Sequence, residues 1–198
     1  AREIQISFLP KECPHVPGWQ VCADWRSARE IGGDFYDFIW LDTKHLALVI
    51  ADVSDKGVPA ALFMALSRTV MRASATDGRS PVEALMRANE LLTADTSSGM
   101  FVTLFYGILD ITSGELKYAR AGHNPPLHFD RAGGRVRSLE SKGIVLGIIE
   151  EVSFEERAVT LGPDDVLVLY TDGVTEAINS KEEEYGIERL IEVIRAHG

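Results

Sequence analysis

Two stretches of the chain share one pattern, in which an unbroken apolar run ends on an aspartate. The first run, Leu46–Ala51, ends on Asp52, and the second stretch, Val166–Asp172, has the sequence VLVLYTD. A short run of this kind predicts a strand that is buried on both faces. A carboxylate at the end of such a strand lies at the rim of the core, where burial is costly without a positively charged partner.

The remaining hydrophobic pattern predicts an α+β domain whose strands are mostly joined by hairpins. Helices are expected over Pro59–Ala75, from Pro81 to a fading end around Thr96–Gly99, and over Gly186–His197. Further strands are expected at Gln20–Arg26, Phe35–Leu41, Phe101–Asp110, Leu116–Ala121, Leu127–Phe129, Val136–Leu139 and Ser153–Leu161. The spacing of Ser80, Pro81 and Glu83 predicts a capping box at the start of the second helix.

A third acid, Asp34, follows a Gly-Gly pair, and we expect it to meet Asp52 and Asp172 at one point. Three converging carboxylates without matching lysines or arginines suit a hard cation with oxygen ligands, magnesium or manganese. The alternative is three solvated turn residues, because aspartate is common in turns. Strand-end placement fits both interpretations.

Composition narrows the classes of partner. The 198 residues suffice for one domain, and the net charge of −10 argues against nucleic acid or an anionic membrane as the main partner. Cys13 and Cys22 lack metal-ligand or redox-pair spacing, which favours a reducing, cytoplasmic setting. No apolar segment reaches the ~18 residues of a membrane helix.

The first ten residues predict the end of a helix that begins upstream. Apolar residues Ile4, Phe8 and Leu9 form a stripe with Ala1, and Pro10 ends it. Such a helix packs on the domain or pairs with its copy in a homodimer. A frayed chain end is the alternative.

Four motifs, in order and over nearly the whole chain, resemble one family. They are GGDFYDF at 32–38, ADVSDKGVPAALFMA at 51–65, the run 106–127 that ends in AGHNPPL, and YTDGVTEAIN at 170–179. The chain is similar here to the SpoIIE-type branch of the PPM, or type 2C, metal-dependent serine/threonine protein phosphatases. Four motifs in one order are specific, whereas any one alone would not be.

The resemblance implies an αββα sandwich of two antiparallel sheets flanked by helices. It also implies two manganese or magnesium ions. By position, Asp34 matches an acid on one metal, Asp52 the acid that bridges both, the Val53 carbonyl the next ligand, and Asp172 an acid on the other metal. Residues 1–10 then match the end of a linker helix from an upstream sensor or receiver domain, and residues 11–198 the phosphatase domain.

The activity implied is hydrolysis of phosphoserine or phosphothreonine by a metal-activated water, without a covalent enzyme intermediate. In this branch the substrate is usually an anti-sigma-factor antagonist or a similar signalling protein. No nucleic acid and no membrane are expected as partners of this segment.

Two departures from the family pattern bear on activity. Ser54 stands where eukaryotic relatives carry a histidine thought to protonate the leaving group, and His123 is expected to fix a turn rather than replace it. Family members also end with a strand opened by an Asp-Asp type motif, and none follows before Gly198. Either the sequence stops before that strand or the protein lacks this ligand, and in the second case one metal would bind weakly and activity would be low.

Three further residues have weaker candidate roles. Arg29 is a candidate for contacting a substrate phosphate, although an ordinary surface arginine is the favoured interpretation, and Asp55 is a candidate for orienting a metal-bound water. Asp37 lies three residues after Asp34, so on a strand it should face the other way and act structurally. Arg68 and Arg72 are expected to be a solvated pair.

Two other functions compete with the active phosphatase. A catalytically weak phosphatase-like module that binds its partner would explain the missing terminal acid. A nucleotidyl cyclase is suggested by the likeness of GGDFYDF to a GGDEF signature, but it leaves the ADVSDKG and YTDGV motifs unexplained.

Overall fold

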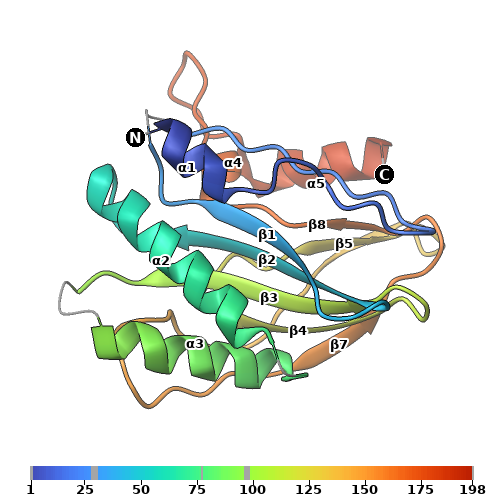
Figure 1. Ribbon diagram of the computed structural model, residues 1–198. Coiled ribbons are helices and arrows are strands. Elements are labelled where there is room, and N and C mark those ends of the chain that lie inside the picture. The colour runs from blue at the N-terminus through green and yellow to red at the C-terminus, as the bar shows by residue number, and fades with distance from the viewer. Residues whose placement is uncertain (1, 28–30, 77, 96–98, 198) are drawn as a thin grey trace.

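The computed structural model describes residues 2–27, 31–76, 78–95 and 99–197. Figure 1 shows its helices and strands, most of them labelled, coloured along the chain from the N-terminus to the C-terminus. They are α1 Arg2–Phe8, β1 Phe35–Trp40, β2 His45–Val53, α2 Val58–Ser74, α3 Pro81–Asp95, β3 Val102–Asp110, β4 Glu115–Ala121, β5 Leu127–Asp130, β6 Arg135–Ser138, β7 Arg157–Thr160, β8 Val166–Val168, α4 Asp172–Thr175 and α5 Gly186–His197.

The strands form two antiparallel sheets. The larger has the order β1-β2-β3-β4-β7 and the smaller the order β6-β5-β8. Hairpin connections join β1 to β2, β3 to β4 and β5 to β6, as the turn residues between these strands predict. The α+β class is therefore confirmed.

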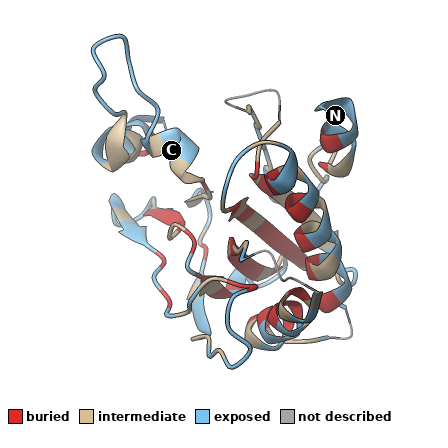
Figure 2. Ribbon diagram, turned by 90° about the vertical axis from the view of Figure 1, so that its left-hand side faces the viewer, coloured by how far each residue is buried: buried red, intermediate tan, exposed pale blue. Residues whose placement is uncertain are grey.

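Helices cover the outer face of each sheet. α2 and α3 pack on the larger sheet, and α5 packs on β5 and β6 of the smaller one. Figure 2 shows the sides of α2 and α3 that face the sheet as buried. One apolar cluster lies between these helices and the larger sheet, a second lies between the sheets, and a third lies under α5. This is the αββα sandwich expected from the resemblance.

Strand β2 lies in the middle of this packing and contributes to two cores. Ala47, Val49 and Ala51 face α2 and α3, whereas Leu46 and Leu48 face the smaller sheet. Because side chains alternate along a strand, Asp52 shares the face of Leu46 and Leu48. The run therefore points its terminal carboxylate into the space between the sheets.

Three strand predictions need correction. Ser153–Leu161 pairs only over Arg157–Thr160, which lie opposite β4. Gln20–Arg26 forms no strand, because no described strand of either sheet pairs with it. Indole hydrogen bonds near its two ends attach it to the domain: Trp19 donates to the Ile111 carbonyl at 3.0 Å and Trp25 to the Asp34 carbonyl at 3.1 Å. The predicted strand Val166–Asp172 pairs only as far as Val168, which lies opposite Leu127, the first residue of β5.

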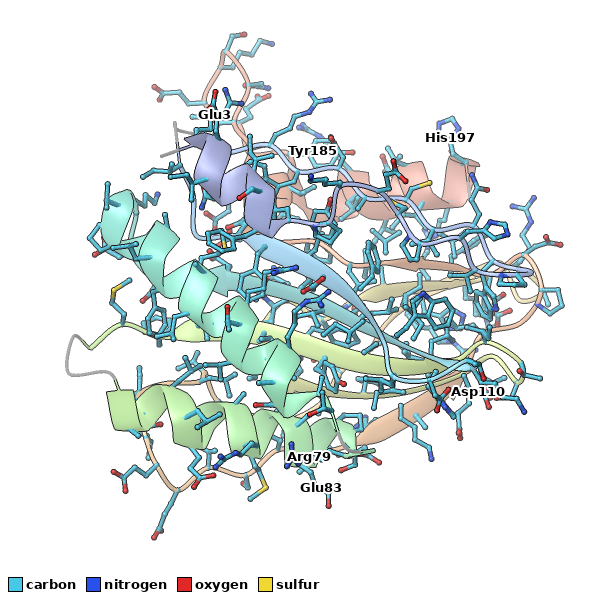
Figure 3. All side chains as sticks on the ribbon, viewed as in Figure 1. Glu3, Arg79, Glu83, Asp110, Tyr185 and His197 are labelled. Carbon is cyan, nitrogen blue, oxygen red and sulfur yellow. The ribbon has the colours of Figure 1, made fainter. Side chains whose placement is uncertain are left out.

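The predicted start of α3 is confirmed. Ser80 N donates to the Glu83 carboxylate at 2.8 Å, and Glu83 N donates to the Ser80 hydroxyl at 3.3 Å, which is a reciprocal capping box. Figure 3 shows Glu83 at this end of the helix. Among the described residues, no helix has the length and apolar character needed to cross a membrane.

Candidate metal centre

The register of β1 and β2 brings two of the predicted acids together. Phe35 pairs with Ala51, so Asp34 comes opposite Asp52 at the end of the ladder. Asp34 shares a side of β1 with Phe38, which packs between the sheets. Both acids therefore lie at one end of the space between the sheets.

Gly33 permits the close approach of these two segments. A Cβ at this position would lie 2.7 Å from the Val53 carbonyl oxygen and 3.3 Å from Oδ1 of Asp52. A side chain would therefore collide with the backbone of β2, which explains the glycine before Asp34. The Val53 carbonyl, a predicted ligand, faces this turn.

The third acid, Asp172, comes from the smaller sheet. After β8 the chain leaves the sheet, and Asp172 opens the short helix α4. The preceding Thr171 occupies the N-cap position but does not cap its own helix. Its hydroxyl instead donates to Oδ2 of Asp34 at 2.6 Å, which joins the two sheets at the acid cluster.

The electrostatics of the cluster are those of carboxylates crowded together. Burial raises the pKa of Asp52 well above its usual range, and the neighbouring Asp34 carboxyl and the charge of Asp172 raise it further. Lys56, in the turn after β2, opposes this shift. The cluster thus favours either a shared proton or a bound cation.

The donor set fits a divalent metal. It consists of carboxylates and a carbonyl oxygen, the ligands that magnesium and manganese prefer, and the crowding of the acids is relieved by a cation. Within the described ranges, however, no three His, Cys, Asp or Glu side chains already form a group that could hold a metal ion. Asp34, Asp52 and Asp172 approach one another, and the metal assignment for them and for Val53 stays a prediction.

His123 lies behind this cluster rather than in it. Its Nδ1 is 2.9 Å from the Thr103 hydroxyl. The same hydroxyl donates to the Asp52 carbonyl oxygen at 3.2 Å. A β-bridge between Leu104 and Gly122 places the histidine there. Burial lowers the pKa of His123 to about 4, so the ring is neutral at pH 7. This contact across the strands agrees with a structural role and does not make it a proton donor.

The other candidates have different positions. The Ser54 hydroxyl accepts from Phe101 N at 3.0 Å and so closes the end of the β2–β3 ladder. Asp55 is an exposed turn residue with φ of 75°, and its Oδ1 accepts from Lys56 N at 2.8 Å. Arg29 lies outside the described residues.

Asp37 faces away from the cluster, as predicted, but its partners were misjudged. It is 1% exposed and contacts Arg68 at 3.0 Å and Arg72 at 2.5 Å. The two arginines of α2 are therefore not a solvated pair, because both turn toward the buried acid of β1. The i, i+4 spacing places Arg68 and Arg72 on one face of α2, but the sequence does not show that Asp37 is the partner of both.

Thr171 and Trp25 are contributors that the sequence did not reveal. Both act on Asp34, one on its carboxylate and one on its carbonyl, from 137 and 9 residues away in the chain. Only the YTDG motif hinted at Thr171. The indole of Trp25 gave no signal before the fold was known.

Comparison with known proteins identifies the family to which the chain is similar. The family model described as Stage II sporulation protein E (SpoIIE) matches residues 42–198. Phosphoserine phosphatase RsbU of Bacillus subtilis is 31% identical over 97% of this chain, which spans 58% of that relative's length.

Two solved structures share the architecture. The RsbU and RsbW domains of a Mycobacterium tuberculosis protein match with a TM-score of 0.72 and 31% identity, over 86% of this chain and 48% of that one. The SiaA-PP2C domain of Pseudomonas aeruginosa matches with a TM-score of 0.81 and 21% identity, over all of this chain and 79% of that one. The second likeness supports the fold alone.

Proposed function

The chain belongs to the SpoIIE family, and from this premise we propose that it is a metal-dependent phosphatase domain acting on phosphoserine or phosphothreonine of a signalling protein. The observation that carries the proposal is the approach of Asp34, Asp52 and Asp172 at one end of the space between the sheets. The similarity to a phosphoserine phosphatase supports the same reaction.

Two divalent ions, manganese or magnesium, are proposed to be held by the three aspartates and the Val53 carbonyl. Such ions lower the pKa of water and offset the charge of phosphoryl oxygens. We assign Asp52 as the ligand that both ions would share, because Asp34 and Asp172 both act on its carboxylate and raise its pKa.

The surrounding residues keep the acids in place. Thr171 orients the Asp34 carboxylate, and Trp25 fixes the backbone carbonyl of the same residue. The leaving-group proton is not assigned to His123, because its ring is 1% exposed and neutral at pH 7. The Ser54 hydroxyl accepts a hydrogen bond from Phe101 N, and the leaving-group proton is not assigned to it either. A water held at the proposed metal centre is the proposed proton source.

The proposed substrate is a phosphorylated partner protein of the anti-sigma-factor-antagonist type. The similarity to RsbU supports this class, as does similarity to a structure that joins RsbU and RsbW domains. We further propose a cytoplasmic setting, an upstream sensor or receiver domain joined through residues 1–10, and pairing of α1 in a homodimer.

Hydrolysis of p-nitrophenyl phosphate tests the reaction. We expect turnover with manganese or magnesium and none with EDTA, because the carboxylates alone cannot offset the charge of a phosphoryl group. A phosphoserine form of an anti-sigma-factor antagonist is the second substrate. A folded protein that is silent toward both, with either metal, would contradict the phosphatase and favour the binding module.

The Asp52→Asn variant tests the assignment of the shared acid. Loss of a residue that merely supports a metal ligand already costs about 10–100-fold, so loss of a shared ligand is expected to cost about 100-fold or more in turnover. Asp164→Asn, at an exposed position in the loop between β7 and β8, is the matched control and should retain most activity. Wild-type turnover in Asp52→Asn would refute the assignment.

A further inference from the structure

The N-terminal helix α1 buries a polar residue and exposes its isoleucines. Gln5 is 3% exposed, whereas Ile4 and Ile6 are 65% and 44% exposed. Figure 2 shows this helix, next to the N label, as exposed over most of its surface with a narrow buried band. Burial of an amide is costly unless its hydrogen bonds are satisfied. The contacts of Gln5 therefore explain how α1 is held.

The Gln5 amide pairs with both polar groups of a single backbone residue, Gly32. The Gly32 N–H donates to Oε1 of Gln5 at 3.1 Å, and Nε2 of Gln5 donates to the Gly32 carbonyl. The N–H and the carbonyl belong to the peptide groups before and after Gly32. One side chain thus fixes the orientation of two consecutive peptide planes, as a neighbouring strand would.

These two peptide planes lead directly to the candidate metal centre. Gly32 is followed by Gly33, which packs against the Val53 carbonyl, and then by Asp34. Two glycines in succession have wide conformational freedom, so the turn needs external contacts to define it. Trp25 and Thr171 hold Asp34 itself, and Gln5 holds the turn on its N-terminal side. Figure 1 shows α1 above the start of β1, where this turn lies.

We propose that Gln5 is a positioning residue for Asp34, so that the docking of α1 sets the affinity of the acid cluster for a divalent cation. The inference rests on the proposed function, because it concerns the metal ligands assigned there. It adds that α1, which lies outside the sandwich, affects cation binding at the site through the side chain of Gln5. When Gln5 is withdrawn, the Gly32–Asp34 turn loses its fixed geometry and the cation binds less tightly.

The test compares Gln5→Met with Ile4→Met. Methionine keeps about the volume of glutamine but cannot make the two hydrogen bonds, and the control places the same residue at the adjacent, exposed position. Manganese binding is measured by isothermal titration calorimetry. Exchange of the Gly32 amide proton is followed by NMR, and p-nitrophenyl phosphate hydrolysis is measured over a range of manganese concentrations.

For Gln5→Met we expect about a tenfold weaker manganese affinity, in the range found when residues that support metal ligands are removed. We also expect faster exchange of the Gly32 amide and little change in kcat at saturating manganese. Ile4→Met should match the wild type in all three measurements. Gln5→Ala, which removes both hydrogen bonds without adding a charge or an apolar side chain against the Gly32 peptide groups, should weaken manganese affinity in the same direction and serves if Gln5→Met does not fold.

The opposite results would overturn the inference. One is unchanged manganese affinity and unchanged Gly32 exchange in Gln5→Met. The other is a fall in kcat at all manganese concentrations with wild-type affinity, which would mark a purely structural role. If the wild type binds manganese without hydrolysing the substrate, the proposed function fails, while calorimetry and exchange still decide the role of Gln5.

Discussion

At the scale of single residues, His123 shows how the fold holds a titratable group in one state. Its ring is 1% exposed, and the charge of Asp34 and a contact with the Tyr170 backbone only partly offset the effect of burial. The Thr103 hydroxyl of β3 lies 2.9 Å from Nδ1 of His123. The Tyr170 backbone that the ring contacts lies two residues before Asp172. A proton added to this ring would be buried between the sheets. The neutral ring is therefore part of the native state.

The expected consequence is a loss of stability in mild acid. The pKa of His123 is lowered from 6.5 to about 4, so between these values the unfolded chain binds a proton that the folded chain excludes. Its contribution is complete above pH 6.5 and is lost as pH falls toward 4, with a total of roughly 3 kcal/mol. Urea unfolding at pH 7 and pH 5 measures this.

The variant His123→Gln isolates this contribution from those of other titrating groups. It should lose less stability than the wild type between pH 7 and pH 5, because glutamine does not titrate. His15→Gln, at an exposed position, should keep the wild-type dependence. Parallel pH dependences in wild type and His123→Gln would show that the ring is not held neutral by the fold.

At the scale of elements, a buried ion cluster joins β1 to α2. Asp37 accepts from Nε and Nη2 of Arg72, at 2.5 and 2.9 Å, and from Arg68 on the next turn of the helix. β1 carries Asp34 at its start, and α2 follows the turn after Asp52. The cluster therefore fixes the two elements that flank the candidate metal centre.

Removal of the central acid should be destabilising. Asp37→Asn leaves two arginines without their counter-charge and weakens the charge-assisted hydrogen bonds to the buried side chain. Because the Arg68 and Arg72 side chains are 15% and 44% exposed and can be solvated, we expect a cost of about 1–3 kcal/mol. Arg87→Gln is the control, because its pair with Glu90 is on the surface of α3 and should contribute under about 0.5 kcal/mol. Chemical denaturation compares the two. A loss in Asp37→Asn as small as in Arg87→Gln would mean that the cluster is dispensable.

Elements were predictable where the signal was local. The apolar run of β2, the start of α2 at Val58–Pro59 and the capping box of Ser80 depend on neighbouring residues, and the structure confirms them. Gln20–Arg26 has the alternation of a strand but pairs with none, since pairing depends on a partner that sequence does not specify. The roles of Arg68 and Arg72 were hidden for the same reason.

At the scale of the whole molecule, the approach of the three acids was predictable but their support was not. Each acid is marked by its own strand end or glycine turn, so Asp34, Asp52 and Asp172 could be named from sequence. Thr171 and Gln5 act through contacts over 137 and 27 residues, which become visible only when the two sheets and α1 are assembled. The metal assignment itself remains a prediction.

The two sheets meet at an acid cluster, so a cation bound there should stabilise the entire fold. Manganese that binds the native state alone adds about 2.7 kcal/mol at a concentration 100 times its Kd. For a domain of this size that corresponds to a rise in Tm of roughly 5–10 °C.

Differential scanning calorimetry with manganese and with EDTA measures this rise in Tm. In Asp52→Asn the rise should largely vanish, even though this variant removes a crowded carboxylate and should be no less stable without metal. An equal rise in Tm in both proteins would mean that manganese binds elsewhere. It would also mean that the stabilising effect of the cation does not depend on the three aspartates.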